Sequence, residues 1–185
     1  MTDIIPLYSA FLGSRLLASG PLPDVARAAA DAQGEGSPIL IFDDATGKET
    51  DLDLRGGPEA AAARYAPPDE ARGRGRPKLG VIAREVTLLP RHWEWLAAQR
   101  GGASHALRRL IDAARQADGG VTTARQRQER CYRVVTALAG DLPGYEEATR
   151  ALFAGDRAAF EGQTAAWPPD IQAYAARLAW PNEAL

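Results

Sequence analysis

Four aspartates lie close enough in the sequence to suggest a metal site: Asp43, Asp44, Asp51 and Asp53. Their carboxylate oxygens are the ligands that Ca²⁺ and Mg²⁺ prefer in proteins. Asp51 and Asp53, however, alternate with leucines, and this alternation is typical of a half-buried strand whose polar side chains face solvent. We therefore interpret the aspartates as a solvated strand face and expect neither a metal nor a cofactor.

Three further residues of reactive type lack the partners that catalysis or metal binding requires. His92 and His105 have no Cys or His neighbours at the spacing of a zinc site. Cys131 is the only cysteine, and it falls on an apolar helical stripe, which indicates packing. The sequence contains no nucleophile–base pair, phosphate-binding loop or dinucleotide fingerprint, so we expect that the protein is not an enzyme.

A short basic segment, Arg74-Gly75-Arg76-Pro77-Lys78, has the composition of a minor-groove ligand. Glycine and proline keep the backbone thin and extended, so that the segment fits a narrow A·T-rich groove. Two guanidinium groups then meet the most negative electrostatic potential of the DNA. The segment resembles the core of an AT-hook, and a basic flexible linker is the alternative interpretation.

The charges of the chain are segregated into blocks. The net charge is −2, but residues 71–133 carry 14 Lys and Arg against 5 Asp and Glu, whereas residues 1–70 carry 5 against 12. Residues 134–185 are acidic again, with 3 against 7. Such segregation predicts separate surfaces of opposite charge, and the basic centre is where a polyanion would bind.

A strand followed by two helices is predicted directly after the basic segment. Val81–Leu89 has strand composition, Pro90 begins a helix, and Gly101-Gly102 ends it. Ser104 is the expected N-cap of a second helix over 105–116. This second helix carries an apolar stripe at spacings of three and four residues, formed by Leu107, Leu110, Ile111 and Ala114.

Residues 81–118 thereby resemble the ribbon-helix-helix family of bacterial DNA-binding proteins. The resemblance implies a homodimer in which two chains pair their strands into a ribbon that enters the major groove. It implies a base contact for Thr87 and a cytosine contact for Glu85, both on the outward face of the strand. Phosphate contacts are expected for Lys78, Arg84, Ser104, His105 and Arg108. An ordinary strand-helix-helix within a packed core is the alternative.

The flanking regions complete an α+β fold. Residues 1–55 form a predicted small acidic β-α-β-β module. Its elements are a strand or hairpin arm over 8–19 with a turn at Gly13, a helix over 21–32, and a hairpin that joins 39–42 to 49–54. Residues 56–80 read as a flexible linker, with one short helical stretch at 59–64. Residues 119–185 form a predicted helical region, with helices over 123–139, 145–154, 156–166 and 169–180.

The chain as a whole resembles the bacterial domain-of-unknown-function 2239 family. The residues that carry the resemblance are spread along the chain, at 8–13, 41–47, 75–80, 85–96 and 152–156. The family has no established activity, so the resemblance implies no function.

The composition predicts a cytoplasmic protein. No apolar run is long enough for a membrane span, and the N-terminus lacks the features of a signal peptide. We therefore expect a cytoplasmic, nucleoid-associated protein that binds double-stranded DNA, with a preference for A·T-rich sites, as a transcriptional regulator or architectural protein. The alternative is a protein-interaction adaptor, or an antitoxin-like protein that binds a partner through its acidic flanks.

Overall fold

A computed structural model describes residues 7–67 and 84–181 of the chain. The chain divides into two compact units. The larger unit comprises Met1–Pro68 and Thr123–Leu185, and the smaller unit comprises Asp69–Thr122. Helices dominate and one small antiparallel sheet lies near the N-terminus, so the predicted α+β class is confirmed.

The sheet of the larger unit has three strands in the order β2-β1-β3. Strand β1 (Leu7–Leu12) pairs antiparallel with both β2 (Arg15–Pro21) and β3 (Ile39–Asp43). The β1–β2 turn contains Gly13 at φ +56°, a conformation that glycine adopts without steric cost. The predicted hairpin arm over 8–19 and its turn at Gly13 are confirmed.

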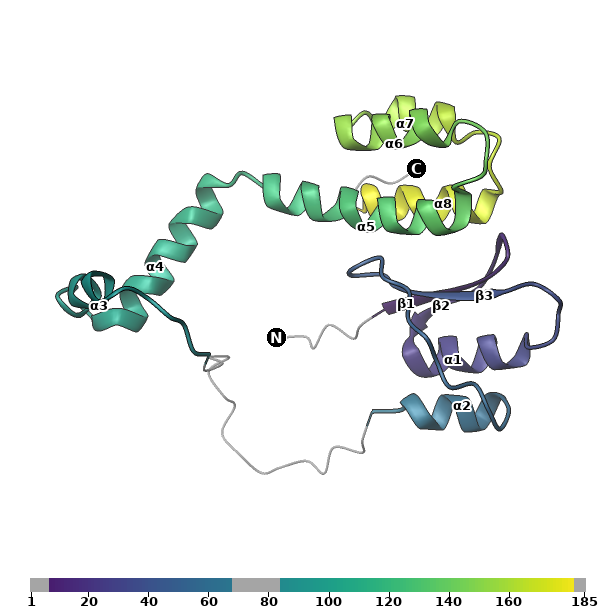
Figure 1. Ribbon diagram of the computed structural model, residues 1–185, viewed down its shortest axis with the longest axis horizontal. Coiled ribbons are helices and arrows are strands. Elements are labelled where there is room, and N and C mark those ends of the chain that lie inside the picture. The colour runs from purple at the N-terminus through teal and green to yellow at the C-terminus, as the bar shows by residue number, and fades with distance from the viewer. Residues whose placement is uncertain (1–6, 68–83, 182–185) are drawn as a thin grey trace. The chain divides into compact units, whose positions relative to one another are not determined.

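The two faces of the sheet pack against different helices (Figure 1). On one face, Ala10 and Ile41 pack with Val25 and Ala29 of α1 (Leu22–Asp31). On the other face, Phe11 and its neighbours in β3 enter a larger core formed with the C-terminal helices. Successive residues of a strand point to opposite faces, so adjacent residues such as Ala10 and Phe11 belong to different cores.

Four helices form the C-terminal part of the larger unit. These are α5 (Val121–Ala139), α6 (Tyr145–Ala154), α7 (Arg157–Gln163) and α8 (Pro169–Ala179). Gly155 at φ +71° ends α6, and the carboxylate of Asp156 accepts a hydrogen bond from the N–H of Ala159 at 2.9 Å, which caps α7. All four predicted helices are present, with α7 shorter than the predicted 156–166.

These helices share one core with the sheet. Cys131, Val134 and Val135 of α5 are fully buried in the same cluster as Phe11 and Phe42. The N-terminal module (1–55) and the C-terminal helical region (119–185), which were predicted as separate domains, therefore share one core. Packing between segments so far apart leaves no local signature in the sequence. The strands and the C-terminal helices each show the apolar spacing of a half-buried element, and that spacing does not say which element covers the apolar side.

The segment over 49–54 does not form the predicted strand. Pairing with β3 extends only to the Phe42–Glu49 bridge and the hydrogen bond from the N–H of Thr50 to the carbonyl of Ile41 at 2.8 Å. Beyond it, Leu52 and Leu54 pack against α1 and α2 (Pro58–Tyr65). The observed order is β-β-α-β rather than β-α-β-β. Residues 7–21 form a hairpin of two strands, and hydrophobic contact of Leu52 and Leu54 with two helices replaces the second hairpin.

Helix α2 lies within the predicted linker over 56–80. Its Ala61 is fully buried and packs against Ala26 and Ala30 of α1. The predicted helical stretch over 59–64 is confirmed. The described beginning of the predicted linker is thus part of the larger unit.

The smaller unit contains helices α3 (Pro90–Ala97) and α4 (Gly102–Ala117), the two helices predicted after the basic segment. Residues 84–89, which precede α3, have no regular secondary structure. No helix within 7–67 and 84–181 is long and apolar enough to span a bilayer.

Candidate functional site

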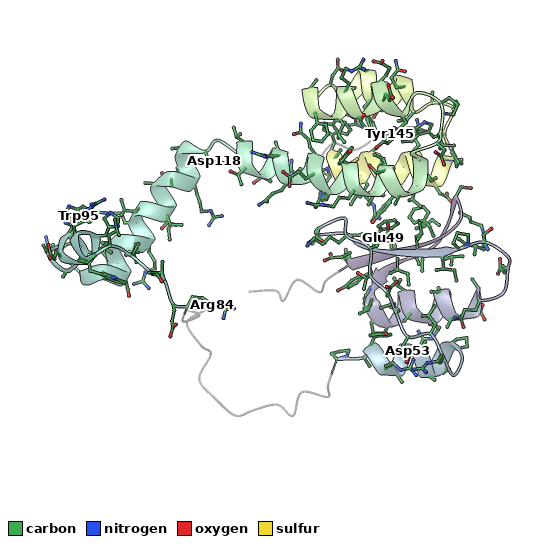
Figure 2. All side chains as sticks on the ribbon, viewed as in Figure 1. Glu49, Asp53, Arg84, Trp95, Asp118 and Tyr145 are labelled. Atoms are coloured by element: carbon green, nitrogen blue, oxygen red, sulfur yellow. The ribbon has the colours of Figure 1, made fainter. Side chains whose placement is uncertain are left out.

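The predicted DNA-contact residues fall in two groups. Arg74, Gly75, Arg76, Pro77 and Lys78, the AT-hook-like segment, lie outside the described residues. The remaining predicted contacts lie in the smaller unit. There, Arg84 precedes α3, which carries Trp95 (Figure 2).

The described residues of the predicted ribbon, 84–89, are exposed except for Leu88, which is half-buried. Arg84, Glu85 and Thr87 all lie on the surface, as a strand that contacts DNA requires. Residues 84–89 are the described part of the predicted strand over 81–89. They pair with no strand among the described residues, so the structure does not support the predicted strand. A single strand cannot satisfy its own N–H and C=O groups, so ribbon formation requires a second chain.

Ser104 does not cap α4, which corrects the prediction from the sequence. The helix begins two residues earlier, at Gly102, and its N-cap is Gly101 at φ +89°. A Cβ on Gly101 would lie 2.9 Å from the imidazole of His105, so glycine is required both for the backbone angle and for the contact. Ser104 is exposed in the first turn of the helix, with no side-chain hydrogen bond to the backbone there.

Exposed arginines without partners distinguish the smaller unit. Six are present over 84–122, and within the described residues none of them has a hydrogen bond or an ion pair. They are Arg84, Arg91, Arg100, Arg108, Arg109 and Arg115. The same stretch carries only four acidic residues, and one of these, Asp118, instead accepts hydrogen bonds from the N–H and hydroxyl of Thr122 at 3.0 and 2.7 Å.

The arginines of the larger unit differ, because most are held by carboxylates of the same chain. Arg15 pairs with Glu35 at 2.7 Å, and Arg150 pairs with Glu147 at 2.6 Å. Arg27 contacts Glu59 at 2.9 Å, and this charge pair raises the pKa of Arg27 and lowers that of Glu59. The positive charge that is available to an external anion is therefore concentrated in the smaller unit.

The smaller unit also exposes large apolar side chains. The exposed fractions are 54% for Val86, 49% for Trp95 and 55% for Ile111, and Leu89, Trp93 and Leu110 are exposed as well. Within its described part, only Leu96 and Ala106 are buried hydrophobic residues. Monomeric domains seldom leave so much of their apolar surface in water, and such patches mark association surfaces.

Three of the four aspartates of the candidate metal site, Asp43, Asp44 and Asp53, make hydrogen bonds within the larger unit. Asp43 accepts a hydrogen bond from the N–H of Ala45 at 2.8 Å and so shapes the turn after β3. Asp53 binds Arg55 through paired hydrogen bonds at 2.9 and 2.8 Å, and these bonds hold the pKa of Asp53 well below its usual range. Over the described ranges, no group of three His, Cys, Asp or Glu residues is arranged to hold a metal ion.

Cys131 lies in the core, as its apolar stripe predicted. It is fully buried, and its thiol donates a weak hydrogen bond to the carbonyl of Ala175 at 3.4 Å. Burial raises the pKa of the thiol to about 12. A neutral, buried thiol of this kind is not a nucleophile.

The sequence did not reveal a polar cluster that lies between the sheet and α8. The hydroxyl of Tyr174 donates to Asp44 at 2.7 Å, and Nη2 of Arg177 contacts the hydroxyls of Ser9 and Ser19 at 3.3 and 3.2 Å. Ser9 is fully buried and Tyr174 is 2% exposed. These residues are far apart in the sequence, and no local pattern joins them.

The comparisons with known proteins identify a family and no function. A family model described as an uncharacterized protein conserved in bacteria (DUF2239) matches residues 7–179, nearly the full chain. No curated protein and no solved structure matches the chain. The resemblance of the chain to the DUF2239 family is thereby confirmed.

Proposed function

We propose that the chain, which belongs to the bacterial DUF2239 family, binds double-stranded DNA as a transcriptional regulator or a nucleoid-associated protein of the cytoplasm. The observation that carries the proposal is the set of six exposed, unpartnered arginines over 84–122 of the described chain. Unpaired guanidinium groups are the donors that phosphates attract, and each phosphate contact releases condensed counterions from the DNA.

The arginines of α4 lie on a helix whose other side is apolar. Arg108, Arg109 and Arg115 are exposed, whereas Ala106 is buried against the rest of the smaller unit. We assign phosphate contacts to Arg84, Ser104, His105 and Arg108, because they lie before α3 or near the start of α4. Exposed Thr87 is the candidate base contact, and Glu85 is the candidate acceptor for a cytosine amine.

The basic segment that precedes this unit adds a second mode of contact. Arg74 and Arg76 would lie in the minor groove and Lys78 would contact a phosphate, as their spacing around Gly75 and Pro77 indicates. This mode predicts a preference for A·T-rich duplexes, because their minor groove is narrow and its potential strongly negative.

A homodimer would provide the partner that the smaller unit lacks. Two chains that pair residues 81–89 would satisfy the backbone groups of both segments. The same association would cover Val86, Leu89 and Ile111, which are about half exposed in the single chain. Full burial of an exposed apolar side chain contributes about 1.5–3 kcal/mol, and a half-exposed side chain gains about half of that. Several such residues from each chain together therefore favour a dimer.

The test is a gel-shift series with A·T-rich and G·C-rich duplexes over a range of salt concentrations. We expect binding that weakens steeply with salt and that is tighter on A·T-rich DNA. Arg108→Ala should weaken binding and reduce the salt slope by about one unit, since one phosphate contact is lost. The matched control Arg150→Ala removes an arginine that is already paired with Glu147 and should bind DNA as the parent does. Absence of binding at low salt would contradict the proposal and favour a protein-interaction adaptor.

A further inference from the structure

A cavity of about 420 Å³ opens in the larger unit beside β2 and α8. Leu16 and Ser19 of β2 form one wall, Tyr174 and Arg177 of α8 form another, and Trp180 follows α8. The volume lies within the range of small-molecule sites, about 300–1,000 Å³, and the mixture of apolar walls and a few polar groups is typical of them.

Arg177 is held in the cavity through one of its three nitrogens. All of its polar contacts within the described residues use Nη2, which lies 3.3 and 3.2 Å from the hydroxyls of Ser9 and Ser19 and 3.5 Å from Asp44. Its guanidinium carbon lies 5.1 Å from the centroid of the Tyr174 ring. Within the described residues Nε and Nη1 have no partner, and the side chain is 47% exposed. A positioned guanidinium with free donors is the group that binds carboxylates.

Most of the remaining wall is apolar and suits a flat apolar body, although Arg157 and Asp170 also line the cavity. Trp180 packs against Phe160 with ring centroids 5.3 Å apart, which fixes one side of the indole, and its other surface contributes to the cavity. Leu16 and Ala173 supply further apolar surface. Asp170 also lines the cavity, but one of its oxygens accepts a hydrogen bond from the N–H of Leu16 at 2.8 Å and so joins β2 to α8.

We propose that this cavity binds a small organic carboxylate with an aromatic body, with the carboxylate on Nε and Nη1 of Arg177 and the ring against Trp180. The nearby carboxylate of Asp170 disfavours small inorganic anions, because these would gain no apolar contact to offset the repulsion. The proposal is independent of DNA binding, since the cavity lies wholly in the larger unit.

The experiment is isothermal titration of the full chain with indole-3-acetate and with the uncharged indole-3-acetamide. The acetate should bind at least about tenfold more tightly, which corresponds to one charge-assisted hydrogen bond. Ala173→Phe should abolish binding of both ligands, because Ala173 is an exposed wall residue and a phenyl group there fills the cavity without entering the core. Arg177→Gln should remove the preference for the acetate.

Arg150→Gln is the matched control, since Arg150 lies on α6 and pairs with Glu147 outside the cavity. It should bind the acetate as the parent does. Circular dichroism melts establish that each variant is folded, and if Arg177→Gln does not fold, Ala173→Phe carries the test. Equal affinity for acetate and acetamide, or unchanged binding by a folded Ala173→Phe variant, would overturn the proposal, as would the absence of acetate binding at millimolar concentration.

Discussion

The phenolic oxygen of Tyr174 lies 2.7 Å from Oδ1 of Asp44, although 130 residues separate the two in the sequence. Asp44 belongs to the turn after β3, and Tyr174 belongs to α8. The bond therefore joins the N-terminal and C-terminal segments of the larger unit. Burial, followed by the negative charge of Asp44, raises the pKa of Tyr174 far above its usual range, so the phenol remains a hydrogen-bond donor even above pH 10, where a free tyrosine ionises.

Tyr174→Phe should destabilise the larger unit by about 1–3 kcal/mol, because a buried hydrogen bond to a carboxylate is lost while the ring is kept. Urea denaturation measures the free energy of unfolding. The matched control is Tyr132→Phe, since Tyr132 is 40% exposed and packs its ring on Phe153. A loss for Tyr174→Phe no larger than for the control would mean that the Asp44 contact contributes nothing.

Gly47→Ala should be among the most destabilising small substitutions in the chain. Gly47 has φ +67°, and a Cβ there would lie 2.2 Å from the carbonyl oxygen of Arg130 in α5. Strain and overlap together should cost about 2–5 kcal/mol. Gly36→Ala is the control, because Gly36 has φ +82° but nothing within 4 Å, and strain alone costs about 1–2 kcal/mol. Equal losses for both variants in thermal or urea unfolding would contradict the close approach of the turn to α5.

Stability should fall as the pH rises above 9, because the thiol of Cys131 ionises in the unfolded chain and stays neutral in the fold. The pKa of the thiol is raised from 9.0 to about 12 in the fold. The stability that comes from keeping the thiol neutral is therefore complete below pH 9 and is lost as the pH rises from 9 to about 12. The slope should reach about 1.4 kcal/mol for each pH unit. Cys131→Ala should reduce the slope just above pH 9, where most tyrosines, with an ordinary pKa of 10.0, are still neutral, although its overall stability is lower. An unchanged slope in the variant would show that another group causes the loss.

Ile111→Glu should dissociate the proposed dimer while the single chain stays folded, because Ile111 is 55% exposed within one chain. A charge at an apolar interface loses its hydration without gaining a partner. Sedimentation velocity should give twice the chain mass for the parent and the chain mass for the variant. Phe153→Glu is the control, since Phe153 is 51% exposed in the larger unit. A monomeric parent at micromolar concentration would eliminate the ribbon-helix-helix dimer.

Two substitutions separate the two proposed modes of DNA contact. Arg76→Ala removes a guanidinium from the minor groove, so it should reduce both the A·T preference and the salt slope, the latter by about one unit. Thr87→Ala leaves the charge unchanged, so the salt slope should persist while discrimination among sites falls by about 1–2 kcal/mol. Fluorescence anisotropy with paired duplexes measures both effects. If Arg76→Ala binds both duplexes as the parent does, the basic segment serves only as a linker.

Local signals in the sequence were sufficient to locate most helices. The predicted helix over 145–154 matches α6 residue for residue, and the predicted starts at Pro90 and Pro169 are those of α3 and α8. Proline at a first helical position and glycine after a last one act through the backbone of their own segment. The first and last residues of such helices can therefore be predicted without any knowledge of the tertiary structure.

The segment over 49–54 shows where a local pattern is ambiguous. Alternating Asp and Leu predicted a strand, and Leu52 and Leu54 are partly buried as that pattern requires. The N–H of Asp53, however, donates to the hydroxyl of Tyr65 at 2.6 Å instead of to a strand. Alternation reports which side chains are buried, but it does not report whether the backbone pairs with a neighbouring strand.

By itself, the sequence determined the α+β class, the helices and the segregation of charge, because each of these depends on local composition or periodicity. It also carried the resemblance to the DUF2239 family, through segments spread along the chain. Only the tertiary structure decided that residues 1–68 and 123–185 form one unit. It also brought Ser9, Asp44, Tyr174 and Arg177 together, left the arginines over 84–122 without partners in the described chain, and made Gly101 the N-cap in place of Ser104. Contacts between distant segments depend on how whole faces of the sheet and helices pack, and a sequence pattern records only that a side chain is buried, not what it meets.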